Sequence, residues 1–229
     1  MVEIVVIHLT RMRTGHVCVA GLDRNGRHIR PVPARERLRK ELTADYGGPF
    51  RVGAVVDIGV TQPRPVPPEV EDCVFDVQAA CMTRMSDPAK LWRFLDQLSK
   101  PSLREIFGDR LSRDGRTASM PGGTGIASLG ICRPPSRVTL DRSYSKLRLV
   151  MTDEDLGRLS LPLTDLRLYN LESDTIEGRR VEVLADRLRR RDALLSVGVG
   201  RAWAPDDEEP RHWLQVNNVH LDDNPLWPE

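Results

Sequence analysis

Short apolar runs separated by turn sequences dominate the first half of the chain. A strand is expected where apolar and β-branched residues alternate with polar ones or fill a run of about four to eight positions. These runs are Val2–Leu9, His16–Leu22, His28–Val32, Val52–Val60 and Val70–Val77. Asn25-Gly26 suits the positive φ of a hairpin turn, so the first three runs are expected to form a meander.

The same pattern returns in the second half of the chain. Its expected strands are Ser128–Cys132, Arg137–Leu140, Lys146–Thr152, Leu161–Tyr169, Ala193–Arg201 and His212–Leu221. Many short strands with turn signals between them are typical of small barrels or sandwiches.

Four stretches carry helical signals instead. They are Ala34–Thr43, Pro88–Leu98, Pro101–Phe107 and Gly178–Arg191. Asp87-Pro88 is a capping sequence, and Trp92, Phe94 and Leu95 are expected on the buried side of the helix that follows. The fold class is therefore mainly β with helical insertions, an α+β chain.

A polar, glycine-rich stretch marks the expected boundary between two modules. Residues 112–127 include Gly122-Gly-Thr-Gly125 and are expected to connect an N-terminal module, 1–115, to a C-terminal module, 125–229. The N-terminal module would carry the helical insertion. No GK[ST] follows the glycines, so this stretch does not match a phosphate-binding P-loop.

Charge narrows the function further. The 229 residues include 34 basic and 33 acidic side chains, so the net charge is close to zero. This balance excludes a polycation that coats nucleic acid by bulk attraction, and any such binding must use local patches. Only Lys40, Lys90, Lys100 and Lys146 are lysines. The arginine bias suits contacts with phosphates and base edges, although a GC-rich genome would also produce it.

The cysteines and histidines do not form a metal-binding pattern. The four cysteines lack CxxC spacing and the five histidines are scattered, so neither a transition metal nor a cofactor is expected. No apolar run approaches the roughly 20 residues of a membrane-spanning helix, and no signal peptide is visible. A cytoplasmic protein with reduced thiols is expected.

The last two expected strands carry the clearest polar and aromatic pattern. Ser196–Trp203 is followed by His212–Asn218, where alternation places Trp213, Gln215 and Asn217 on one face. His212, Leu214, Val216 and Asn218 would lie on the other face. Amides read base edges and tryptophan stacks on bases. The alternative that Trp213 belongs to the core stays open.

Three stretches carry a family resemblance: Leu9–Val32, Leu161-Pro-Leu-Thr-Asp-Leu-Arg-Leu168, and Ser196–Arg201 with His212–Asn218. In these stretches the chain resembles the dual OB-containing domain family, prokaryotic proteins associated with nucleic-acid biology and conflict systems. The resemblance spans almost the whole chain. It implies two OB-like small barrels in one chain and a binding role.

The expected function is nucleic-acid binding, as an accessory or recognition subunit of a prokaryotic defence or nucleic-acid-processing system. The turn Thr10–Gly15 is expected to approach the C-terminal strands. The expected contact residues are Arg11, Arg13, Arg30, Arg201, Trp203, His212, Trp213, Gln215, Asn217 and Asn218.

Two alternatives remain open at this point. One is an adaptor that docks an effector such as a nuclease or helicase. The other is an enzyme acting on a nucleotide, with Asp165 and His212 as acid or base. Asp57 and Asp165 could equally be turn-forming or ion-paired carboxylates, and no nucleophile has a base beside it in the sequence.

Overall fold

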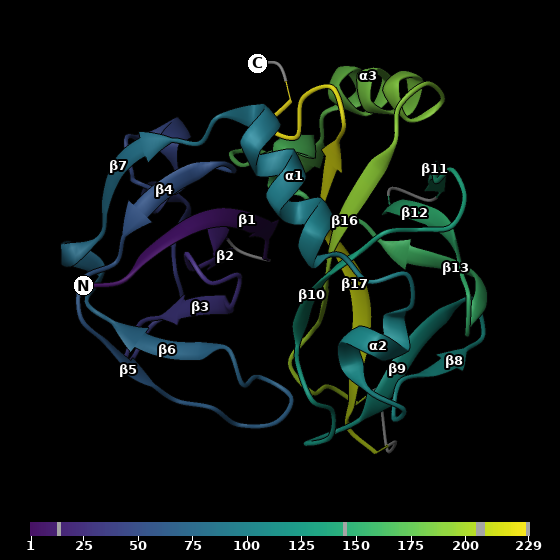
Figure 1. The fold of residues 1–229 in the computed structure, drawn as a ribbon, viewed down its shortest axis with the longest axis horizontal. Coiled ribbons are helices and arrows are strands. Elements are labelled where there is room, and N and C mark those ends of the chain that lie inside the picture. The colour runs from purple at the N-terminus through teal and green to yellow at the C-terminus, as the bar shows by residue number, and fades with distance from the viewer. Residues whose placement is uncertain (13–14, 144–145, 205–208, 228–229) are drawn as a thin grey trace.

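The N-terminal half of the chain is a small β-barrel. A computed structural model describes residues 1–12, 15–143, 146–204 and 209–227. Figure 1 shows this barrel beside a second strand-rich half. Its strands are β1 (Glu3–Arg11), β2 (Val17–Leu22), β3 (His28–Val32), β4 (Ala54–Asp57), β5 (Thr61–Pro63), β6 (Asp72–Phe75) and β7 (Cys81–Met85).

Strand pairing closes this barrel. β1, β2 and β3 form the expected antiparallel meander, β6 joins β3 in parallel, and β4 joins the other side of β1. β4 pairs with β7 and β5 pairs with β6, so the segments 54–63 and 72–85 behave as two long, bent strands paired with each other. The result is a five-stranded barrel of the OB type.

The connection from β3 to β4 differs from the expected helix over Ala34–Thr43. This segment contains only the 3-10 turn Lys40–Leu42, which is followed by a second turn, Ala44–Tyr46. Arginine and glutamate favour helices in isolation, but short helices need an apolar stripe packed on a core. In this stretch, Leu38 is the buried apolar side chain.

Two helices follow the first barrel. α1 (Pro88–Leu98) begins as expected at Asp87, whose carboxylate accepts a hydrogen bond from the backbone N of Lys90 at 2.8 Å. Its fully buried side chains are Leu91 and Leu95. Trp92 and Phe94, expected on that face, are only partly buried against the same cluster. α2 (Leu103–Phe107) begins at Ser102.

The C-terminal half is a second, partly open barrel. Its central elements are β11 (Thr139–Ser143), β12 (Lys146–Asp153), β13 (Gly157–Pro162), α3 (Gly178–Leu188), β16 (Ala193–Val199) and β17 (Arg211–Leu221). β11, β12 and β13 form a meander, β16 and β17 pair antiparallel, and Leu163 after β13 bridges in parallel to Val216 of β17. The 3-10 turn Leu166–Leu168 and the small pair β14 (Tyr169–Asn170) and β15 (Thr175–Ile176) precede α3.

Three further strands extend this barrel. β10 (Leu129–Cys132) pairs with the free edge of β16, and β9 (Thr117–Pro121) pairs with the start of β17. β8 (Ser112–Asp114) forms a hairpin with β9. Residues 112–127, expected to be a connector, therefore contain a hairpin that is part of the second sheet. That residues 1–115 and 125–229 form two separately folding modules stays a prediction.

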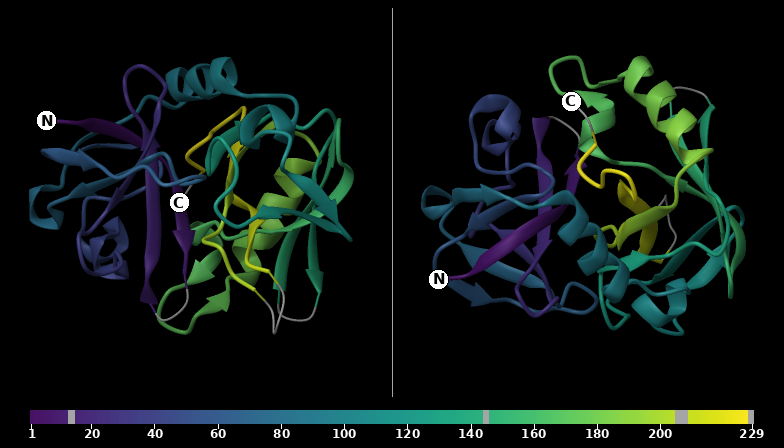
Figure 2. Two further views of the ribbon diagram at one scale, coloured as in Figure 1. Left: turned by 90° about the horizontal axis from the view of Figure 1, so that it is seen from below. Right: turned by 45° about the horizontal axis from the view of Figure 1, so that its top comes forward.

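α1 lies between the two barrels, and Figure 2 shows it from two further directions. Leu91 and Leu95 of α1 join Ile7 and Leu22 of the first barrel to Ile131 of β10 in one apolar cluster, which also contains Leu194. Each barrel has its own larger core on the inner side of its strands. The two barrels therefore share an interface with an apolar part, and the polar part lies along β17.

Several properties of the described residues bear on the earlier expectations. No helix among them is long and apolar enough to cross a membrane. In the same part of the chain, no group of three or more histidine, cysteine or acidic side chains could hold a metal ion. All four cysteines are free thiols.

Candidate nucleic-acid interface

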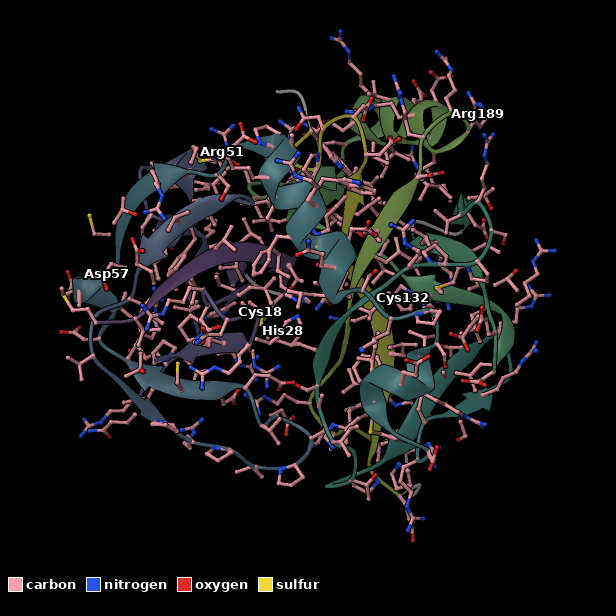
Figure 3. The ribbon with its side chains drawn as sticks, viewed as in Figure 1. Cys18, His28, Arg51, Asp57, Cys132 and Arg189 are labelled. Carbon is pink, nitrogen blue, oxygen red and sulfur yellow. The ribbon has the colours of Figure 1, made fainter. Side chains whose placement is uncertain are left out.

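The outer face of β2 and β3 in the first barrel is covered by the second half of the chain. OB barrels bind oligonucleotides on the face of their second and third strands. Figure 3 shows Cys18 of β2 and His28 of β3 in the middle of the molecule, toward the C-terminal half. Arg30 of β3 retains only 6% of its exposure, and its Nε donates to Asp72 Oδ1 at 2.5 Å.

Arg201 approaches the same carboxylate from the second half. Its Nη2 donates to Asp72 Oδ2 at 2.6 Å, and its Nη1 lies 3.3 Å from Glu69 Oε1. The buried negative charge of Asp72 is compensated by two arginines, Arg30 from the first barrel and Arg201 from the second. The structure therefore brings Arg30 and Arg201 together, in an ion-pair network that joins the barrels.

β17 follows the expected alternation only as far as Val216. Trp213 and Gln215 are partly exposed, whereas His212, Leu214 and Val216 are buried. The register between β16 and β17 then shifts, because Ser196 pairs with Asn218 but Val197 pairs with Val216. This bulge leaves Asn217 as the extra residue.

The bulge turns both asparagines toward β1. Asn218 Oδ1 accepts a hydrogen bond from Leu9 N at 2.7 Å, and Asn217 Nδ2 lies 3.0 Å from His8 Nδ1. The expectation that Asn218 shares a face with Leu214 and Val216 is therefore wrong. β1 lies beside β17 at His8 and Leu9. The expected approach of the turn Thr10–Gly15 stays a prediction, because Arg13 and Thr14 lie outside the described residues.

The hydrogen bonds fix the tautomer of His8. Gln215 Nε2 donates to Asn217 Oδ1 at 2.9 Å, so the amide nitrogen of Asn217 donates to His8 Nδ1. His8 Nε2 then carries the proton, and burial lowers the pKa of His8 well below its usual value. Four buried side-chain nitrogens of the described residues have no hydrogen-bond partner in the protein: His8 Nε2, His28 Nε2, Arg30 Nη2 and Trp213 Nε1. Such groups are commonly satisfied by ordered water.

His212 is bound within its own half of the molecule. Its Nε2 accepts from Gly123 N at 3.1 Å, and its Nδ1 donates to Gly200 O at 2.8 Å. Both ring nitrogens are therefore used by backbone groups, and the side chain is buried. His212 anchors the ends of the β16–β17 hairpin to the glycine-rich turn.

Arg11 lies apart from this cluster. Its guanidinium donates to both carboxylate oxygens of Asp174, at 2.5 and 2.7 Å, and it lies 4.8 Å from the ring centre of Tyr169. The hydrogen bond with Asp174 raises the pKa of Arg11. Arg13 lies outside the described residues.

Trp203, Trp213 and Gln215 remain on an accessible surface. Trp203 is 61% exposed and pairs through its backbone with Arg211, the first residue of β17. Arg211, Trp213 and Gln215 alternate with the buried residues of that strand. Arg211 Nε donates to Ser119 Oγ of β9 at 2.8 Å. The sequence singled out the tryptophans and the glutamine but missed Arg211.

The outer face of β12 and β13 extends this surface and carries further basic residues. Leu147, Leu149 and Leu159 point into the core, so the alternate residues Lys146, Arg148 and Arg158 lie on the outside. Arg148 is partly held by Ser160, since its Nε donates to Ser160 Oγ at 2.9 Å. The alternation Lys146-Leu-Arg-Leu149 was visible in the sequence and could have identified this face.

β9 connects these two parts of the surface. Ser160 N donates to Arg116 O beside β9, and Trp213 of β17 pairs with Ser119 of β9. Ala118 and Met120 of β9 face the core, and Ser119, on the other side of the strand, is fully buried in contact with Arg211 and Asp114. We define the C-barrel face as the accessible outward side chains of β12, β13 and the start of β17, with Trp203: Lys146, Arg148, Arg158, Ser160, Arg211, Trp213, Gln215 and Trp203.

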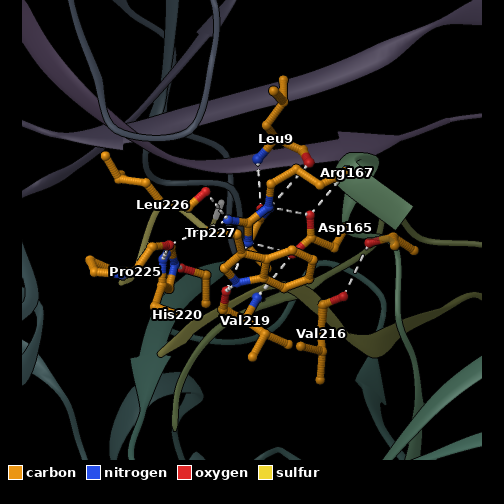
Figure 4. A network of polar contacts seen from close by, with 12 residues as sticks. Leu9, Asp165, Arg167, Val216, Val219, His220, Pro225, Leu226 and Trp227 are labelled. Atoms are coloured by element: carbon orange, nitrogen blue, oxygen red, sulfur yellow. Dashed lines mark hydrogen bonds and ion pairs between the residues drawn. The ribbon is translucent and has the colours of Figure 1, made fainter. Parts of the chain in front are cut away.

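Asp165 forms a structural ion pair and no catalytic pair. Its buried carboxylate accepts from Arg167 Nη2 at 2.7 Å and from Val219 N at 3.1 Å (Figure 4). Arg167 also donates to Val219 O and to the backbone oxygens of Pro225 and Leu226, and it stacks on Trp227 at 3.9 Å. His212 lies seven residues before Val219 on an extended strand, about 23 Å away. The suggested pairing of Asp165 with His212 is therefore wrong.

A comparison with models of known protein families identifies the family of this chain. The model of the Dual OB-containing domain matches residues 2–219. The chain belongs to the dual OB-containing domain family. Searches of curated proteins and of solved structures find no match. In this dual OB chain, the Leu161–Leu168 motif supplies the Asp165–Arg167 pair, and the motif Leu9–Val32 forms the β1–β3 meander.

Proposed function

We propose that this dual OB protein binds single-stranded nucleic acid along its C-barrel face. The observation that carries this proposal is an asymmetry between the barrels. In the first barrel, the face of the second and third strands is buried against the second half of the chain. In the second barrel, the corresponding face of β12 and β13 is open, and the loop from β16 to β17 presents Trp203.

The chemistry of the C-barrel face matches a single strand. Lys146, Arg158 and Arg148 supply positive charge for phosphates, while the exposed indole of Trp203 offers a surface on which a base can stack. The amide of Gln215 offers polar groups for base edges, and the partly exposed ring of Trp213 lies on the same side of β17. OB barrels combine the strand face with the loop between their last two strands in this way.

The remaining expected contacts divide by burial. Arg201 is about half-exposed and is proposed to reach a phosphate while it keeps its ion pair with Asp72. Four expected contacts are buried and are therefore assigned structural roles: Arg30, His212, Asn217 and Asn218. Arg11 lies on a separate part of the molecule. We assign the chain a recognition or accessory role in nucleic-acid processing or prokaryotic defence. The separation of Asp165 from His212 favours binding over catalysis.

Fluorescence anisotropy with a labelled single-stranded oligonucleotide at two salt concentrations tests the proposal. Replacing Lys146 and Arg158 by glutamine should weaken binding to all sequences and reduce the salt slope by about 0.7 for each lost phosphate contact. Trp203→Ala should cost ~1–3 kcal/mol of binding and leave the slope unchanged.

A matched control removes the same charge elsewhere. Lys90 and Arg93 are exposed on α1, away from the C-barrel face, so replacing both by glutamine should leave the affinity and the slope near wild type. Equal weakening by both double variants would mean that only net charge matters. A folded protein that binds no oligonucleotide at low salt would refute the proposal.

A further inference from the structure

The second barrel is open along one edge, and this edge is the strand β11. β10 pairs with the side of β16 that faces away from β17. Among the described residues, β11 therefore has β12 as its one partner strand. Every second residue of an edge strand directs its backbone N–H and C=O groups away from its partner. These groups can pair with an incoming strand.

A groove lies beside this edge. A pocket of about 400 Å³ is lined by the segment 137–140 at the start of β11 and by Ala185, Leu188 and Arg189 at the end of α3. Val138 and Leu188 are buried members of the core, so they form an apolar floor. A volume at the lower end of the range for ligand pockets suits one or two apolar side chains.

Positive charge surrounds the groove. Arg137 and Arg189 lie on its two walls and are both exposed, and Arg190 follows directly. Arg137 Nη1 donates to the backbone O of Arg189, which ties β11 to the end of the helix. Arg189 and Arg190 share Asp186 as their acidic partner, so the rim has more positive than negative charge.

We propose that this groove docks an acidic, extended segment of a partner protein. The segment adds to β11 as a further strand, an apolar side chain enters the pocket, and neighbouring carboxylates meet Arg137 and Arg189. In such strand addition, main-chain hydrogen bonds supply affinity and alternate side chains supply specificity. The site lies one strand away from the C-barrel face, shares no residue with it and does not depend on nucleic-acid binding.

A fluorescein-labelled peptide of eight residues that alternates aspartate and leucine serves as the probe. The wild-type chain should bind it with a Kd below about 1 mM, and replacing its aspartates by lysine should weaken binding about tenfold or more. A peptide methylated on alternate backbone nitrogens should also bind at least about tenfold more weakly, because it cannot complete the strand pairing.

Variants of the protein locate the site. Arg137→Gln with Arg189→Gln should weaken the acidic peptide about tenfold while leaving oligonucleotide binding unchanged. Lys90→Gln with Arg93→Gln on α1 removes the same charge away from the groove, so it serves as the matched control and should leave peptide binding unchanged. Circular dichroism and thermal unfolding confirm that both double variants are folded.

Three results would overturn the proposal. The first is a Kd above about 1 mM for the acidic peptide. The second is equal binding of the methylated peptide, which would show simple charge attraction. The third is a dimer of the wild-type protein in light scattering that becomes a monomer when Arg137 and Arg189 are replaced. That result would mean that a second copy of the chain occupies the groove. If the protein binds no oligonucleotide, the peptide-binding test remains valid, because the two sites are tested separately.

Discussion

At the residue scale, Asp165 illustrates how far a carboxylate can be interpreted from sequence. Its position in Leu161–Leu168 suggested either an acid catalyst or an ion-paired group, and the structure confirms the second interpretation. The partner, Arg167, is only two residues away and could have been proposed. Its stacking on Trp227 could not, because that contact depends on how the C-terminal segment folds back over β17.

Asp165→Asn should destabilise the protein by about 3–5 kcal/mol, because it leaves a largely buried guanidinium without its charge partner. Urea unfolding at neutral pH measures the loss. Arg84→Ala is the matched control, since Arg84 and Glu3 form an exposed ion pair whose removal should cost about 0–1 kcal/mol. Similar losses in both variants would contradict the structural role of Asp165.

At the scale of single elements, the sequence predicted most strands and the cap of α1, because alternation and capping are local signals. It did not predict the bulge at Asn217, because register depends on the facing strand. Gly198 lies on that facing strand, and a Cβ there would be 2.6 Å from Asn217 Nδ2 and 3.2 Å from Ser128 O. The glycine therefore leaves room for the asparagine that reaches His8.

Gly198→Ala should displace Asn217 and destabilise the protein by about 1–3 kcal/mol. Gly200→Ala, two residues later, is the control, because a Cβ there meets Trp213 O at an ordinary 3.8 Å. That change should be neutral or stabilise the protein by up to about 1 kcal/mol. Chemical denaturation measures the free energy of unfolding of both variants. Equal stability of Gly198→Ala and Gly200→Ala would contradict the role assigned to Gly198.

At the scale of the whole molecule, the family resemblance predicted two barrels, but no local pattern shows which faces they bury against each other. Arg30 looked like a phosphate ligand because arginine is usually exposed. It is buried because the second half covers β3 and Asp72 compensates its charge. The sequence identified only part of the C-barrel face, because the limits of this face depend on where the first barrel packs against the second.

The docked barrels bury histidines in their neutral form. His220 is fully buried between Ser196 Oγ and Pro225 O, and burial lowers its pKa to about 4. In the unfolded chain its pKa returns to about 6.5. Below pH 6.5 the unfolded state therefore binds a proton that the folded state does not, and stability falls until the pH reaches about 4.

His220 alone should lower the unfolding free energy by about 2 kcal/mol between pH 7.5 and pH 5. Urea titrations at the two pH values measure the difference. His220→Asn, a neutral side chain of similar hydrogen-bonding capacity, should reduce this pH dependence by the same amount even if its stability is lower at both values. A wild-type protein equally stable at both pH values would show that the histidines are not held neutral.

The covered face of the first barrel also has a consequence for synthesis on the ribosome. The last strand of that barrel ends at Met85, and β17 begins at Arg211, about 125 residues later. At roughly 5–20 residues per second, the face of β2 and β3 stays uncovered for about 6–25 s. His28 and Arg30 keep part of that face hydrophilic, which should help the nascent barrel to avoid aggregation until the second half covers it.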